Sequence, residues 1–116
     1  MRGRVGRLAA STLLLLSVAT CAGPAATSAG PAATDHVDLP RSYLFSPADI
    51  AVGVGTTVTW TNSDQFTHSV RIVDGDQMVG IMKPGESVSF TFAQAGTYRY
   101  ECTFHPQNMR GSVTVR

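Results

Sequence analysis

The chain has 116 residues, enough for one small domain, and its formal net charge is only +1. All eight acidic residues, but only six of the nine basic ones, lie from Asp35 onward. This part of the chain is therefore slightly acidic and carries no basic stripe. We therefore do not expect it to bind nucleic acid.

Residues 1–21 have the pattern of a signal peptide of the lipoprotein type. Three arginines precede an apolar run, residues 8–19, that is too short for an ordinary membrane span. Cys21 then stands where a bacterial lipoprotein signal places its lipidated cysteine, although ordinary cleavage near Ala22 is an alternative. We expect Cys21 to be lipidated and the protein to be extracytoplasmic, in the periplasm or anchored to the outer face of the cell membrane.

Residues 22–35 are predicted to form a disordered linker. The hexapeptide Ala-Gly-Pro-Ala-Ala-Thr occurs there twice, at 22–27 and 29–34, and it contains no charged or large apolar residue. Such a segment cannot bury enough surface to offset the entropy of ordering it. The folded domain is therefore expected to span residues 36–116, with the linker as its tether.

The folded region shows short segments in which apolar and polar residues alternate, and no helical period. Turn residues separate these segments, most clearly Asp74-Gly75 and Pro84-Gly85. The pattern predicts strands at 50–54, 57–61, 68–72, after residue 75, and at 87–92, 98–101 and 113–115. We therefore expect an all-β Greek-key sandwich of about seven to eight strands.

Alternation also indicates where two reactive side chains point. Cys102 shares its strand face with the two tyrosines before it, and His68 shares its face with the apolar residues that follow it. A polar histidine that points inward needs a partner, so His68 and Cys102 are expected to meet. Because Cys102 is the only cysteine after residue 21, it should be reactive, paired between chains, or bound to a metal.

Two further metal-binding side chains follow Cys102 in the spacing Cys-x2-His-x3-Met, which adds His105 and Met109. Two imidazoles and a thiolate with a weak axial thioether are the ligands of one copper ion that cycles between Cu(I) and Cu(II). Zinc is the main competitor. A thioether is a poor zinc ligand, however, and structural zinc sites normally use four strong ligands.

Two other interpretations are less well supported. A Cys–His hydrolase would need an oriented base and an oxyanion hole, and neither is recognisable in the sequence, so we expect no enzyme. An immunoglobulin domain is suggested by Tyr100 two residues before Cys102 and by Trp60 upstream, but the cysteine that should precede the tryptophan is absent.

The region from about residue 45 to residue 116 resembles the cupredoxins, most closely the amicyanin/plastocyanin group of small blue copper proteins. The matching stretches are Phe45-Ser46-Pro47, residues 55–62, Asp64 shortly before His68, residues 83–86, residues 95–98 leading to Cys102, and residues 109–113. The resemblance implies that His68, Cys102 and His105 are equatorial copper ligands and that Met109 is the axial one. It also implies an eight-stranded sandwich in which His105 lies closest to solvent and is the exit for the electron.

The sequence departs from these relatives at two positions. The His-x3-Met spacing lies between the x2 of amicyanins and the x4 of plastocyanins, so Met109 is the least secure ligand. Ser69 stands where plastocyanins carry Asn, so we expect their side-chain brace across the site to be missing. The backbone N–H of Ser69 is still expected to reach the thiolate sulfur.

These observations predict an exported, monomeric blue copper protein that carries one electron at a time. Its partner would be a transient redox protein (a cytochrome, an oxidase or a dehydrogenase) that docks on an apolar patch formed by Phe104, His105 and Pro106. The alternative is a copper-binding module for delivery or scavenging of copper at the cell surface.

Overall fold

The computed structural model of the protein describes residue 6, residue 17 and residues 30–116. Cys21, nearly all of the predicted signal peptide, and residues 22–29 of the predicted linker lie outside the described residues. Within the described residues no helix has the length and apolar character needed to cross a membrane.

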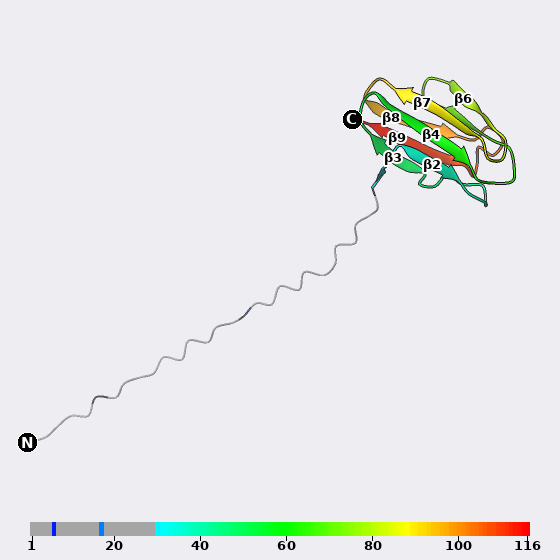
Figure 1. The fold of residues 1–116 in the computed structure, drawn as a ribbon. Helices are drawn as coiled ribbons and strands as arrows, with labels where there is room; N and C mark the ends of the chain where they lie inside the picture. The colour runs from blue at the N-terminus through cyan, green and yellow to red at the C-terminus, as the bar shows by residue number, and fades with distance from the viewer. Residues whose placement is uncertain (1–5, 7–16, 18–29) are drawn as a thin grey trace, which may run out of the picture.

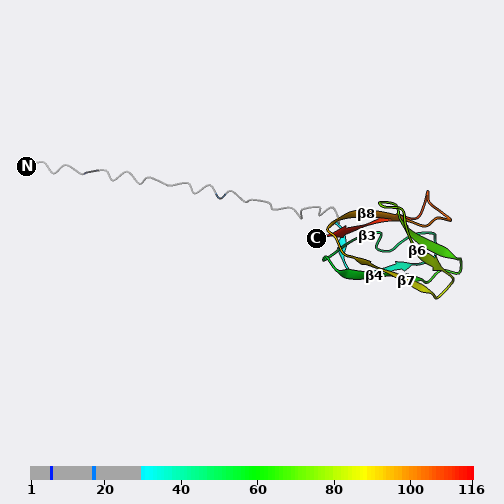
Figure 2. The same ribbon diagram turned by 90° about the horizontal axis from the view of Figure 1, so that it is seen from above.

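Residues 30–116 form nine strands, which build two facing β-sheets (Figures 1 and 2). In chain order these are β1 (Ala32–Ala33), β2 (His36–Leu39), β3 (Asp49–Val52), β4 (Thr56–Asn62), β5 (His68–Ile72), β6 (Gln77–Met82), β7 (Ser87–Phe92), β8 (Gly96–Glu101) and β9 (Arg110–Val115). One sheet has the order β1-β3-β9-β8-β5-β6, and the other has the order β2-β4-β7. The predicted all-β sandwich is confirmed.

The two strands that sequence analysis missed come first in the chain. β2 pairs in parallel with β4 and buries Val37 and Leu39 completely. β1 pairs in parallel with β3 through Ala32 and Ala33, inside the segment predicted to be a linker. These two alanines can extend the sheet because pairing with a sheet edge uses backbone groups and needs no large side chain.

Strand β4 shows how alternation divides the sandwich into an inner and an outer face. Val58 and Trp60 are fully buried between the sheets. The intervening threonines face outward, and each bonds a hydroxyl of β7: Thr57 with Thr91 at 2.7 Å, Thr59 with Ser89 at 2.9 Å and Thr61 with Ser87 at 2.8 Å. Cross-strand pairs of this kind stabilise the sheet and keep its register.

The centre of the core is an aromatic group around Tyr100. Its ring meets Trp60 edge-on at 5.3 Å and Phe45 at 4.8 Å between centroids. Its hydroxyl crosses above Gly111, its partner on β9, and donates a 2.6 Å hydrogen bond to the carbonyl of Ala48. Burial raises the pKa of Tyr100, so the phenol stays neutral and keeps this hydrogen bond.

The end of the sandwich opposite the C-terminus carries the loop of residues 102–109 between β8 and β9 (Figures 1 and 2). In the described part of the chain, β5 and β8 pair at only two positions, Arg71 with Glu101 and Ile72 with Tyr100. Beyond them the ladder ends, and the buried residues His68 and Cys102 lie at this end. The fold thus leaves a gap between two neighbouring strands at the point where the sequence predicts a site.

Gly111→Ala is expected to destabilise the domain, because a Cβ there would lie 2.2 Å from the Ala48 oxygen and 2.4 Å from the Tyr100 ring. Overpacking of this kind costs about 1–3 kcal/mol. Urea unfolding of the metal-free protein measures it. Gly53→Ala is the control, since its nearest neighbours would be 3.8 Å away and its free energy of unfolding should change by less than about 1 kcal/mol. Equal effects would contradict the close packing of Tyr100 on Gly111.

Candidate metal centre

His68, at the start of β5, is fully buried and has a partner on each side of its ring. Its Nε2 atom lies 2.9 Å from the carboxylate of Asp64, which is also buried. The hydrogen bond from His68 holds the pKa of Asp64 below its ordinary value, so the carboxylate is charged and Nε2 carries the proton. The other ring nitrogen, Nδ1, which carries no hydrogen in this tautomer of the neutral imidazole, lies 3.8 Å from the sulfur of Cys102. An imidazole lone pair and a thiol sulfur therefore share one buried space.

Cys102 follows the last residue of β8, and its sulfur receives hydrogen bonds from one residue of β5. The backbone N–H of Ser69 lies 3.4 Å from the sulfur, as the sequence predicted, and the Ser69 hydroxyl lies at 3.7 Å. That hydroxyl is also 2.7 Å from the Thr103 hydroxyl and accepts the Thr103 N–H at 2.8 Å. The prediction of a missing brace is therefore wrong, because the short serine side chain bridges the gap by bonding the Thr103 backbone directly.

The loop after Cys102 is a closed turn held by backbone hydrogen bonds. The N–H of His105 donates to the Cys102 carbonyl at 3.2 Å, and the N–H of Met109 donates to the His105 carbonyl at 2.9 Å. The N–H of Cys102 donates back to the Met109 carbonyl at 3.1 Å. The unusual x3 spacing thus forms a compact turn in which Met109 is fully buried and His105 half-buried.

The four predicted ligands are brought together to different degrees. His68 and Cys102 are in contact, the His68 and His105 rings lie 5.7 Å apart between centroids, and Met109 belongs to the same buried cluster as Cys102. Among the described residues, no group of three or more His, Cys, Asp or Glu side chains that could hold a metal ion is formed. The donor set at this end is nevertheless soft, with a thiol, a thioether and an imidazole nitrogen free of hydrogen, and it fits copper.

Tyr43, an aromatic residue that sequence analysis missed, lies beside these histidines, and Phe66 packs on it. The Tyr43 ring packs edge-on against His105 at 4.6 Å and stacks on Phe66 at 5.6 Å. Ser42 and Tyr43 have φ angles of 96° and 56°, which is uncommon for residues other than glycine. Tyr43 and Phe66 belong to loops without periodicity, so no pattern in the sequence could have placed Tyr43 beside His105 or Phe66 against Tyr43.

The predicted docking residues lie on the surface of the same loop. Phe104 is 51% exposed, whereas His105 and Pro106 are half-buried. A shallow hollow of about 310 Å³ is lined by residues 104–108. With Phe66 46% and Tyr43 36% exposed, the rim of this end is largely aromatic.

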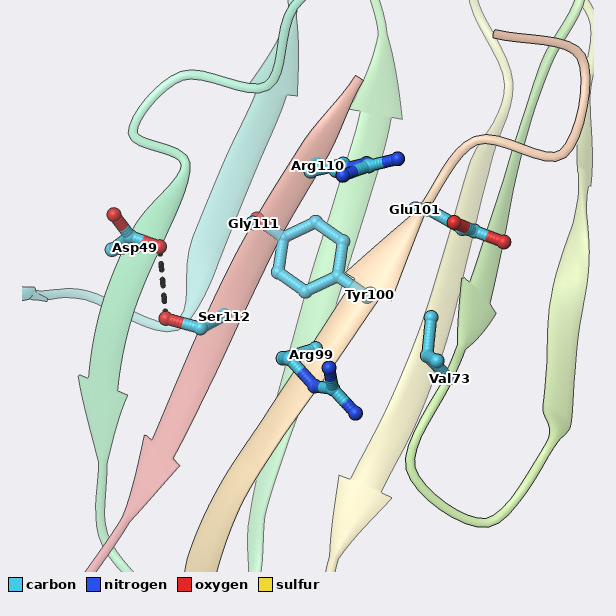
Figure 3. A pocket seen from close by; sticks show the side chains of 8 residues that line it. All are labelled: Asp49, Val73, Arg99, Tyr100, Glu101, Arg110, Gly111 and Ser112. Carbon is cyan, nitrogen blue, oxygen red and sulfur yellow. Dashed lines mark hydrogen bonds between the residues drawn. The ribbon is translucent and has the colours of Figure 1, made fainter. Parts of the chain in front are cut away.

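A larger depression, of about 480 Å³, lies on the outer face of the six-stranded sheet (Figure 3). Its charged side chains already have partners: Asp49 accepts a hydrogen bond from Ser112 at 2.8 Å, and Arg99 binds Asp74 at 2.8 Å. Glu101 pairs with Arg71 at 3.1 Å. None of the predicted ligands lines this depression.

Comparison with known proteins is informative for almost the whole described domain. The family described as copper binding proteins, plastocyanin/azurin family, matches residues 36–116. Amicyanin from Paracoccus denitrificans is 41% identical over 86 residues, which cover 68% of this chain and 63% of the amicyanin. Plastocyanin from Scenedesmus fuscus is 34% identical over 86 residues, which cover 63% of this chain and 87% of the plastocyanin.

Solved structures agree in fold. The crystal structure of amicyanin from Paracoccus versutus has a TM-score of 0.65 at 32% identity, covering 74% of this chain and 84% of that one. A purple cupredoxin from Nitrosopumilus maritimus has a TM-score of 0.62 at 31% identity, covering 70% of this chain and 98% of that one.

Ser69→Ala is expected to destabilise the metal-free domain, because it leaves the Thr103 N–H and hydroxyl without their partner. Ser69 is buried whereas Thr103 is exposed, so the loss is that of ordinary hydrogen bonds, about 0.5–1.5 kcal/mol each, which unfolding in guanidinium chloride would measure. Ser89→Ala is the matched control. It removes an exposed hydroxyl pair and should change the free energy of unfolding by about 0.5 kcal/mol or less. If both variants lost the same stability, the Ser69 brace would have no structural role.

Proposed function

The chain belongs to the plastocyanin/azurin family of copper-binding proteins, and we propose that it is a one-electron carrier with a single type 1 copper site. The observation that carries this proposal is the 3.8 Å approach of His68 Nδ1 to Cys102 Sγ, with both residues fully buried. The other ring nitrogen of His68 is already bonded to Asp64, so Nδ1 is the nitrogen left to bind a metal.

In this proposal His68, Cys102, His105 and Met109 would hold the copper ion, with the Met109 thioether as the weakest of the four donors. Bound there, copper would supply a centre that changes between Cu(I) and Cu(II) by one electron. The burial of Cys102 and Met109 supports their assignment, because both sulfurs are kept from water and from competing reactions. Met109 is supported further by the backbone bonds that tie it to Cys102 and His105.

The chain's own residues would hold the site in one arrangement for both oxidation states. Ser69 donates its backbone N–H to the Cys102 sulfur, which fixes the direction of that side chain. Asp64 fixes the tautomer and the orientation of the His68 ring. A site held in this way needs little rearrangement when one electron moves.

The protein is not an enzyme. The relatives it matches are amicyanins and plastocyanins. In the proposed site, four protein side chains would fill the coordination positions of the metal and leave no open position for a substrate. Activity would therefore consist of electron exchange with another protein.

The electron is proposed to pass through His105, the most exposed of the four ligands. Phe104, His105 and Pro106 would form the centre of the docking patch, with Tyr43 and Phe66 at its rim. Such a small apolar patch suits a transient complex with a cytochrome, an oxidase or a dehydrogenase.

Delivery or scavenging of copper would use the same ligands, but burial argues against it. His68, Cys102 and Met109 each have no exposed surface, so an acceptor protein could not reach them without opening the loop of residues 102–109. The pattern of residues 1–21 supports export, and Cys21 is proposed to be the lipid anchor of an extracytoplasmic protein.

The purified protein is expected to turn intensely blue on addition of one equivalent of Cu(II), and Cys102→Ser should abolish the colour. The reason is that the colour of such a site requires a thiolate bound to copper, which serine cannot supply. Visible absorption and EPR spectra measure it, and voltammetry should show a reversible one-electron couple. Met78→Ser serves as the control, since Met78 is 40% exposed on β6 and outside the proposed site.

A colourless wild-type complex would refute the copper assignment. A blue complex that passes its metal to an acceptor protein faster than it exchanges electrons would refute the carrier and support delivery.

Phe104→Glu is expected to slow electron self-exchange between two copies of the protein by about tenfold or more, since it places like charges on the faces that must meet. NMR line broadening in mixtures of oxidised and reduced protein measures the rate. Val54→Glu makes the same change at a 55% exposed residue near the opposite end and should have little effect. If both variants slowed exchange equally, the patch around Phe104 would not be the docking site.

A further inference from the structure

Asp64 is a buried carboxylate that touches a proposed ligand but is not itself one. The residue is 4% exposed, and its side chain is only 2% exposed. One oxygen accepts the His68 Nε2 proton at 2.9 Å, and the other accepts the Gln65 N–H at 2.7 Å. Both oxygens are therefore occupied, and the charge lies on the side of His68 that faces away from Cys102.

Asn62 fixes the position of this carboxylate. Asn62 is fully buried, and its side-chain oxygen accepts the Asp64 N–H at 2.9 Å. Its amide nitrogen donates to the carbonyls of Phe66 at 2.7 Å and Met82 at 3.0 Å. These three hydrogen bonds of the Asn62 side chain join the end of β4 to β6. They hold the Asp64 backbone in place whether or not a metal is bound.

No permanent positive charge contacts Asp64 among the described residues, although the more distant Arg41 helps to lower the pKa of this carboxyl. In the described part of the chain, no lysine or arginine nitrogen lies within 4.0 Å of its carboxylate, and its one ion-pair partner is His68. A buried charge without compensation is costly. Because His68 would be neutral as a metal ligand, the ion that it binds would bring positive charge to within one imidazole ring of this carboxylate.

We propose that Asp64 is a positioning residue whose fixed negative charge makes the site favour Cu(II) over Cu(I). This inference rests on the proposed function. With the Cys102 thiolate, Asp64 balances the two charges of Cu(II), whereas Cu(I) leaves the buried site with one excess negative charge. Reduction takes one electron from the redox protein partner and transfers no proton. Each reduction therefore works against the field of Asp64, and the reduction potential is lowered.

The size of the effect of Asp64 on the copper ion follows from the low effective dielectric constant of a buried site. A charge one imidazole ring away from the ion is only weakly screened there. We expect Asp64 to change the ratio of Cu(II) to Cu(I) affinity by about tenfold or more, which corresponds to about 59 mV for one electron. An exposed carboxylate elsewhere on the domain is screened by water and salt and should change the ratio far less.

The test compares Asp64→Asn with Asp49→Asn. Both variants remove one negative charge, but Asp49 is exposed at the start of β3, and its carboxylate accepts a hydrogen bond from the Ser112 hydroxyl. Redox titration of the copper-loaded proteins gives the potential, and competition titrations of the metal-free proteins give the affinity for each oxidation state. Asp64→Asn should raise the potential by about 59 mV or more and weaken Cu(II) binding more than Cu(I) binding. Asp49→Asn should do neither.

Each other outcome has a definite meaning. If Asp64→Asn only lowers the stability of the domain, the proposal is overturned and Asp64 has a purely structural role. The same conclusion follows if the variant loses affinity for Cu(I) and Cu(II) equally. The same holds if the two variants shift the potential equally. If Asp64→Asn fails to take up Cu(II) but still binds Cu(I), the proposal stands. A wild-type protein that forms no blue complex refutes the proposed function instead, so the two failures are distinguishable.

Discussion

The hydrogen bonds of Ser69 across the gap between β5 and β8 are the interaction on which the candidate site depends. The ladder between these strands ends after Arg71 and Ile72, and continuing its register would place Ser69 opposite Thr103. The Ser69 hydroxyl accepts the Thr103 N–H there, and its backbone N–H points at the Cys102 sulfur. The strands can therefore separate around His68 and Cys102 without leaving buried backbone groups unpaired, which would be costly.

The same end of the sandwich combines a rigid interior with an aromatic surface. Inside, Asn62, Asp64 and His68 form a chain of hydrogen bonds that runs from β4 to the Cys102 sulfur. Outside, Tyr43 covers one side of His105 and leaves Phe104 exposed. In the proposed site, a buried centre with His105 half-exposed would suit electron exchange while excluding water, because an electron could leave through a ring that a partner can contact.

Alternation along the chain was a sound guide wherever a strand has one buried face. It correctly predicted the inward faces of β4, β5 and β8, and with them the burial of His68 and Cys102. It failed for β1, whose alanines pair with a sheet edge without burying a large side chain. It also could not show that Ser69 would brace the site, since that depends on the separation of two strands that are distant in sequence.

The residue types and spacing of Cys102, His105 and Met109, together with the strand alternation around His68, were determined by the sequence alone. They indicate a soft metal site at one end of a β-sandwich, because such preferences depend on local periodicity and ligand chemistry. Only the tertiary structure decided which nitrogen of His68 faces the sulfur, that Asp64 takes the other nitrogen, and that Tyr43 lies against His105. These contacts join strands and loops without a shared local pattern, and their geometry exists only once the two sheets have packed.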